Sequence, residues 1–285
     1  MTVKLRPGTQ ADAQLCGTIC FEAFKAIGGE HNFPSGFPSP EFARRLLSRM
    51  LAHPQVYCVV AELDGRVVGS NFVDERSCIY GVGPITVDPA VQNGGIGRQL
   101  MEDVIGRATQ RKACGMRLLQ AGFHNRSLAL YAKLGFRARE MVSVLQGAPL
   151  RQRIVGYEVR LATLVDVPAC NRICHRVHGY DREVELREAI EGKTASVVEH
   201  LGHVTGYTTG IAQLAHTVGE ANADLVALIG AAPEFGATGF LLPTRNHEVF
   251  TWCLNGGLKL VYQMTLMTMG LYNEPNGAYL PSILY

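Results

Sequence analysis

In the first half of the chain, segments whose apolar residues recur with the period of a helix alternate with segments typical of strands. Apolar residues recur every three to four positions in segments that predict helices, running from residue 9 or 12 to 26 and over 40–52, 96–110 and 126–134. Runs typical of strands cover 3–6, 56–63, 66–73, 83–87, 116–121 and 136–145, with the hairpin signal Asp64-Gly65 between the second and third. This order of elements predicts an α/β fold with a mixed sheet.

The second half of the chain repeats the pattern that opens the first half. The segment "LRPGTQADAQLCGTIC" from Leu5 aligns without gaps with "VRLATLVDVPACNRIC" from Val159. The identical pairs are Arg6 and Arg160, Thr9 and Thr163, Asp12 and Asp166, Cys16 and Cys170, and Cys20 and Cys174. A repeat of this length indicates two copies of one domain. Gly, Pro and charged residues in 146–156 interrupt the hydrophobic pattern, so we expect domains at 1–147 and 156–285.

Length, composition and charge narrow the class of protein. A chain of 285 residues with 47% hydrophobic residues can bury a sizeable core in two domains. Its formal net charge of +2 argues against a nucleic-acid partner. The chain begins without the pattern of a signal peptide, and it has no apolar run long enough to span a bilayer. We therefore expect a soluble, cytoplasmic protein without a membrane partner, and the sequence leaves room for a homodimer.

The eight cysteines are spread through apolar periodic segments, so we expect reduced thiols packed in the core. One cluster, "CNRICHRVH", invites a zinc interpretation through Cys170, Cys174, His175 and His178. Its spacing fits no common zinc pattern, and the two cysteines lie one helical turn apart on the apolar face. The sequence thus predicts no metal site.

The stretch "VQNGGIGRQLM", residues 91–101, places three glycines at the start of a predicted helix. Because Gly94, Gly95 and Gly97 carry no side chains, an anion can approach the backbone N–H groups and the positive end of the helix dipole. An ordinary tight turn is the alternative interpretation. The stretch lacks the Gly-Lys-Ser/Thr of a Walker loop, and no acidic residue follows where a dinucleotide site needs one.

The order of elements and two motifs resemble the GCN5-related N-acetyltransferase (GNAT) superfamily. Gln92, Gly95 and Gly97 match the pyrophosphate motif Gln/Arg-x-x-Gly-x-Gly/Ala, and "SLALYAKLGF" matches the motif that follows it. The resemblance covers residues 1–147 well. It implies a tandem GNAT acetyltransferase fold that binds acetyl-CoA, or another short acyl-CoA, between the fourth and fifth strands.

The resemblance also implies roles for individual residues. Tyr131 matches the tyrosine that protonates the departing CoA thiolate, although an aromatic residue in the core would look the same. His124 stands where the family has an asparagine that contacts pantetheine, with Asn125 one place later. The residues implied in donor binding are Ile85, Thr86, Val87, Gln92, Asn93, Gly94, Gly95, Ile96, Gly97, Arg98, His124 and Asn125.

Acetyl transfer by direct attack of an amine also needs a base and an acceptor site. Asp74 and Glu75 are the candidate bases, with carboxylates that merely solvate a strand end as the alternative. In the family, the loop between the first two helices forms one side of the acceptor site. This makes Glu30 and His31 candidates for substrate contact.

The second copy has lost these features. It offers Gly219 followed by Glu220, whose charge would repel a pyrophosphate, and Trp252 stands in place of the tyrosine. We therefore expect one donor site, in the first domain, and a degenerate second domain. The favoured function is an acyl-CoA-dependent N-acetyltransferase acting on a primary amine of a small molecule. The alternatives are a CoA-binding sensor or pseudoenzyme, and a protein N-acetyltransferase.

Overall fold

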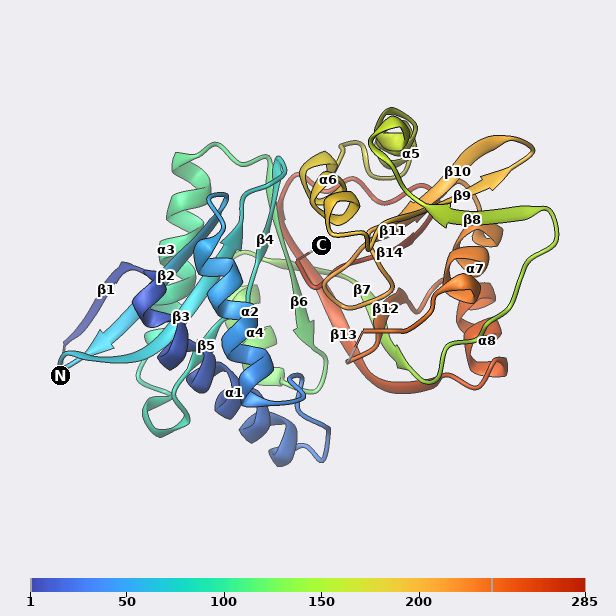
Figure 1. The fold of residues 1–285 in the computed structure, drawn as a ribbon. Coiled ribbons are helices and arrows are strands. Elements are labelled where there is room, and N and C mark those ends of the chain that lie inside the picture. The colour runs from blue at the N-terminus through green and yellow to red at the C-terminus, as the bar shows by residue number, and fades with distance from the viewer. Residues whose placement is uncertain (1, 237, 285) are drawn as a thin grey trace. The chain divides into compact units, whose positions relative to one another are not determined.

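The computed structural model describes residues 2–236 and 238–284, which form two compact units (Figure 1). The first unit comprises the chain up to residue 138, together with 267–271 and 284. The second comprises 139–266 and 272–283. The division into functional domains at 147 and 156 stays a prediction, because compactness and function need not divide a chain at the same residue.

The first unit follows the predicted order of strands and helices. Its elements are β1 (Val3–Pro7), α1 (Ala13–Glu30), α2 (Pro40–Ala52), β2 (Val56–Leu63), β3 (Arg66–Asp74), β4 (Ile79–Val82), β5 (Thr86–Val87), α3 (Ile96–Gln110), β6 (Gly115–Ala121) and α4 (Asn125–Lys133). The strands β1, β2, β3 and β4 pair antiparallel in sequence order, and β4 pairs in parallel with β6. The mixed sheet is therefore confirmed.

One strand differs from the prediction. The expected strand over 83–87 is reduced to β5, while β4 just before it was not expected. Gly83 takes a φ of +132°, and Pro84 has no N–H to donate to a sheet. The extended run is therefore split at this point, so that β4 pairs with both β3 and β6, whereas β5 pairs with β3 alone.

Helices pack on both faces of this sheet. Alternate residues of β2 belong to different cores, because successive side chains of a strand point to opposite faces. Val59 and Ala61 pack with α3 and α4, whereas Cys58 and Val60 pack with α1 and α2. The two helical layers thus hold β2 and β3 between them.

A segment from the far end of the sequence completes the first unit. Met267, near the end of β13 (Lys259–Gly270), is buried in the core under α3. The Leu271 N–H donates to the Cys114 carbonyl at 2.9 Å. Nothing in the local sequence of this segment signals that it joins the first unit.

The second unit repeats the architecture. Its further elements are β7 (Arg137–Gln146), β8 (Tyr157–Leu161), α5 (Val167–His178), α6 (Glu183–Glu191), β9 (Ser196–His200), β10 (His203–Thr208), β11 (Thr217–Gly219), α7 (Asn222–Ala231), β12 (Phe240–Pro243), α8 (His247–Asn255) and β14 (Ala278–Leu280). The strands β14, β11, β10, β9 and β8 form one antiparallel sheet, and β12 pairs antiparallel with β7.

The two units open with the same polar cluster, which confirms the internal repeat. Arg6 binds the Asp12 carboxylate at 2.7 Å, and Arg160 binds Asp166 at the same distance. In each copy, the aspartate also accepts the backbone N–H of the threonine three residues earlier, at 2.8 Å. These contacts hold the pKa of both carboxyls at about 2. The repeated sequence therefore encodes a repeated ion pair that fixes the first strand to the first helix.

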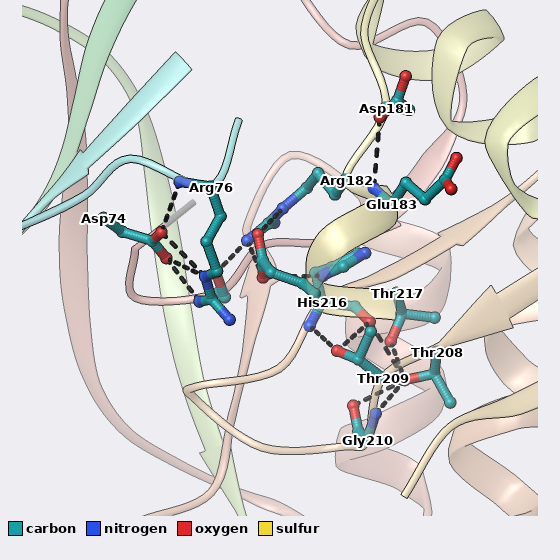
Figure 2. A network of polar contacts seen from close by, with 12 residues as sticks. Asp74, Arg76, Asp181, Arg182, Glu183, Thr208, Thr209, Gly210, His216 and Thr217 are labelled. Carbon is teal, nitrogen blue, oxygen red and sulfur yellow. Dashed lines mark hydrogen bonds and ion pairs between the residues drawn. The ribbon is translucent and has the colours of Figure 1, made fainter. Parts of the chain in front are cut away.

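Within the second unit, a buried polar network surrounds Arg182 and His216 (Figure 2). Arg182 donates to both carboxylate oxygens of Glu185 at 2.8 and 2.7 Å, and to the Ser282 hydroxyl at 2.9 Å. His216 Nε2 lies 3.0 Å from the Tyr207 hydroxyl. Because the charged groups are paired, their burial is tolerated.

The cysteines divide into two groups. Six are buried as expected, but Cys78 and Cys114 are exposed, which corrects the expectation of core thiols for these two. Each lies just before a strand, where the hydrophobic pattern of the strand has not yet begun.

Candidate active site

The glycine stretch forms an uncapped helix start. Gly95 is the N-cap of α3, with φ +81° and ψ 1°, in the left-handed region that favours glycine. No side chain caps this end, and the first turn contains no acidic residue. The first backbone N–H groups of α3 therefore remain available, and together with the helix dipole they suit an anion.

Space around the glycines separates the needs of the fold from those of a ligand. A Cβ at Gly94 would have its nearest contact at 3.7 Å, and one at Gly97 at 3.8 Å, both ordinary distances. Neither residue has a positive φ, whereas Gly95 does. The fold thus requires glycine only at position 95, and the other two leave the backbone open toward solvent.

An arginine that sequence reasoning missed holds this loop. Arg126 in the first turn of α4 donates to Asn93 Oδ1 at 2.8 Å and to Gln92 Oε1 at 2.7 Å. The Gln92 side chain also donates to the Val87 carbonyl at 3.1 Å. Arg126 thus fixes the side chains of Gln92 and Asn93 and adds positive charge beside the loop. Arg98 lies on the exposed face, 3.4 Å from Glu102.

The strand that precedes the loop has one free edge. Ser70 and Gly69 of β3 pair with Thr86 and Val87 on one side of β5, and no described strand pairs with its other side. The pairing of β4 with β6 ends at Gly81↔Arg117, after which the two chain segments are no longer paired. The backbone groups of residues 85–87 are thus placed for an extended ligand to add alongside β5, as in β-augmentation.

His124 is half-buried, whereas its neighbour Asn125 is exposed. His124 is the N-cap of α4, and its Nε2 is buried without a hydrogen-bond partner in the described part of the chain. Burial, followed by the nearby charge of Arg126, lowers the pKa of His124 to about 4. The imidazole is therefore neutral at pH 7 and carries an unused polar atom. Gln120 fixes the turn by donating to the His124 carbonyl at 2.8 Å.

Tyr131 lies on α4, about two helical turns after His124, and its side chain is buried in the core. It is 8% exposed, and its ring packs edge-on against Phe136 at 6.3 Å between centroids. Burial raises its pKa above the usual range, so the phenol stays protonated. The side chain is both a core residue and a potential proton donor.

The loop after α1 packs on the turn before α4. Phe33 stacks on Phe123 at 4.5 Å between centroids, and the His31 ring lies 5.4 Å from the same phenyl ring. His31 and Glu30 also act on the titration of His124 through their charges. The structure thus brings the two predicted acceptor residues beside His124, together with two aromatic residues that the sequence pattern did not reveal.

The two candidate bases are engaged in ion pairs. Asp74 is bound by Arg76, with Nε 2.9 Å from Oδ1 (Figure 2), and Glu75 is bound by Arg107, with Nη2 2.9 Å from Oε2. Asp74 pairs with Gly81, where β4 is still joined to β6, four residues along β3 from the residue that pairs with Thr86. At about 3.3 Å per residue, Asp74 is roughly 13 Å along β3 from the residue that pairs with β5. Their role as a base stays a prediction.

In the second unit, acidic side chains lie at the start of the corresponding helix, α7. The Asp224 side chain accepts the Ala221 N–H at 2.8 Å, directly before α7. Glu220 adds a second negative charge there, paired with Arg176. A Cβ at Gly219 would lie 2.7 Å from the Asp224 Cβ, so this glycine serves close packing. An anion would meet carboxylates here, whereas in the first unit it meets bare N–H groups.

Among the described residues, no group of three or more His, Cys, Asp or Glu side chains is arranged to hold a metal ion. Within 2–236 and 238–284, no helix combines the length and apolar character needed to cross a membrane.

Sequence comparison identifies relatives of the first unit. The sequence profile of the acetyltransferase (GNAT) domain family matches residues 54–138. The N-alpha-acetyltransferase RimI of Mycobacterium tuberculosis is 32% identical over 134 residues, which cover 45% of this chain and 75% of RimI.

Structural comparison extends the likeness to both units. A protein from Pyrococcus horikoshii assigned as an acetyltransferase has a TM-score of 0.76 at 18% identity, over 96% of this chain and 91% of its own. A GCN5-related N-acetyltransferase from Sphaerobacter thermophilus has a TM-score of 0.62 at 16% identity, over 95% and 96%. At these identities, the likeness concerns the fold.

Proposed function

Because the chain belongs to the GNAT acetyltransferase family, we propose that this N-acetyltransferase moves an acetyl group from acetyl-CoA to a primary amine of a small molecule, with the donor bound in the first unit. The observation that carries the proposal is the uncapped, glycine-built start of α3 beside the free edge of β5. The second unit lacks this arrangement, since Asp224 occupies its helix start.

The residues present fit an acyl-CoA. The N–H groups of residues 92–98 suit the pyrophosphate, and Arg126 and Arg98 supply positive charge beside it. The backbone of Ile85, Thr86 and Val87 suits the amide groups of pantetheine. The unpartnered Nε2 of the neutral His124 suits a polar group of the same arm. Asn125, which is exposed, suits the outer rim of this site.

Bound acetyl-CoA supplies a thioester whose carbonyl a neutral amine can attack directly in a ternary complex. The chain supplies position, hydrogen-bond donors and one proton. Tyr131, held protonated by burial, donates that proton to the leaving thiolate. Because water is excluded from the buried site, the interaction between the phenol and the thiolate is stronger than it would be in water. Asp74, Glu75 or a water molecule takes the proton of the incoming ammonium group.

The acceptor side is bounded by Glu30, His31, Phe33 and Phe123. The stacked rings of Phe33 and Phe123 form an apolar wall, and Glu30 is an exposed carboxylate at the end of α1. A wall of this kind suits an amine with an apolar or aromatic body, and the carboxylate suits its cationic group.

A second candidate function rests on a specific observation. The relative at 32% identity is by its printed name an N-alpha-acetyltransferase, so the alpha-amino group of a polypeptide is the other class of acceptor to test.

Release of CoA thiol from acetyl-CoA tests both candidates in one assay. Arylalkylamines and other small primary amines form one arm, peptides with free N-termini the second, and protein without acceptor the blank. Turnover with small amines above the blank supports the proposal, turnover only with peptides supports the second candidate, and binding without turnover indicates a sensor or pseudoenzyme. Sedimentation of the same sample tests whether the protein forms a homodimer.

A further inference from the structure

Two cysteines lie side by side on the surface of the first unit. Cys78 and Cys114 are exposed, whereas the other six thiols are buried. Cys78 directly precedes β4 and Cys114 directly precedes β6. These strands pair in parallel from Ile79↔Gly115 onward, so the two cysteines lie opposite each other directly before the first paired residues.

The backbone holds the two residues at the separation of a disulfide. The Cys114 N–H donates to the Cys78 carbonyl at 2.9 Å. Neighbouring strands lie about 4.8 Å apart, and disulfides join Cα atoms about 4.4–6.8 Å apart. Because directly opposed residues of neighbouring strands point to the same face, both side chains lie on the same side of the strands, and the Cys114 thiol is near enough to raise the pKa of Cys78.

We propose that Cys78 and Cys114 form a reversible disulfide, a modification site whose oxidants are low-molecular-weight disulfides such as glutathione disulfide. The thiolate of one cysteine attacks a sulfur of the oxidant, which forms a mixed disulfide and releases one small thiol. The second cysteine then attacks the protein sulfur of that mixed disulfide and releases the second small thiol. Overall, the protein loses two electrons and two protons, and the oxidant is reduced to two thiols.

The position of the pair determines what the bond changes. The pairing of β4 with β6 lasts only to Gly81↔Arg117, and the disulfide joins the strands at the opposite, paired end. It closes a loop of about 36 residues that contains the glycine stretch and α3. Because a crosslink lowers the entropy of the unfolded chain, oxidation should stabilise the first unit.

The test is oxidation of the native protein with glutathione disulfide, followed by digestion and mass spectrometry. Mildly alkaline buffer is used because burial, followed by the Cys114 thiol, raises the pKa of Cys78. We expect a peptide containing Cys78 joined to one containing Cys114, no retained glutathione, and reversal by dithiothreitol. The melting temperature should rise by roughly 5–10 °C.

Single variants provide matched controls. Cys78→Ser and Cys114→Ser each keep one exposed thiol, so each should retain bound glutathione and show no rise in melting temperature. The six buried thiols should stay unreacted in all three proteins. Glutathione retained on both cysteines of the wild-type protein, or no reaction at either, would overturn the proposal, and so would an unchanged melting temperature in a protein that carries the crosslink.

Discussion

Replacing Gly95 by glutamate separates the needs of the fold from those of the donor site. Gly95 has a φ of +81°, and a Cβ built there meets no atom within 4 Å. The side chain would therefore fit, at a cost of about 1 kcal/mol for the left-handed backbone. In a chain of this size, this lowers the melting temperature by about 2–4 °C.

The effect on the donor is larger. The new carboxylate would stand at the helix start where the pyrophosphate is expected, which also carries negative charge. Each pair of like charges at about 4 Å costs about 1 kcal/mol even in bulk water and several times more near a protein surface. With two phosphate charges, the loss is at least about 2 kcal/mol, so the dissociation constant for acetyl-CoA should rise at least about thirtyfold.

Gly65 offers a matched control. Its φ of +78° is nearly that of Gly95, and its Cβ also meets nothing within 4 Å, but it lies in the hairpin between β2 and β3. Gly65→Glu should lose the same stability and bind acetyl-CoA like the wild-type protein. Calorimetric titration with melting curves measures both quantities. Equal affinities in the two variants would refute the assignment of the glycine stretch to the pyrophosphate.

Three further predictions follow from buried groups. Tyr131→Phe keeps the packing of the ring but removes the proton donor, so kcat should fall about 100-fold at unchanged acetyl-CoA affinity, and a rate within twofold of wild type would leave the tyrosine a core residue. His124→Leu removes a buried polar atom, so the dissociation constant for acetyl-CoA should rise about five- to tenfold. Because the pKa of His124 is lowered to about 4, calorimetry of the wild type should show no change in acetyl-CoA affinity from this imidazole between about pH 6 and 8. Asp12 and Asp166 have pKa values lowered from 3.8 to about 2, so the stability that each adds is present above pH 3.8, is lost as the pH falls toward 2, and amounts to about 2 kcal/mol. The variants Asp12→Asn and Asp166→Asn should therefore lose similar free energy of unfolding in denaturant titrations at neutral pH, and a loss in only one would contradict the equivalence of the two clusters.

Local patterns in the sequence predicted the parts of the fold that depend on local causes. The hairpin at Asp64-Gly65 and the helix start at Ile96 both rest on residues within a few positions of one another. Their conformations follow from turn chemistry, capping and short-range hydrogen bonds.

Features that depend on distant residues were not predictable in this way. Arg126 reaches Gln92 and Asn93 from another helix, and Met267 enters a core built more than a hundred residues earlier in the chain. The partner of Glu75, Arg107, likewise lies 32 residues further along the chain and became visible only in the structure. The sequence located the donor loop from its glycines, but the charges that surround a candidate base are set by tertiary contacts.

The number of acetyl-CoA sites per chain tests the central claim most directly. Calorimetric titration of the wild-type protein should give one site per chain, because the first turn of α3 contains no acidic residue, whereas Asp224 and Glu220 place negative charge at the start of α7. Gly95→Glu should weaken this site at least about thirtyfold, and Gly65→Glu should leave it intact. Two sites per chain, or one site that Gly95→Glu leaves unchanged, would contradict the account.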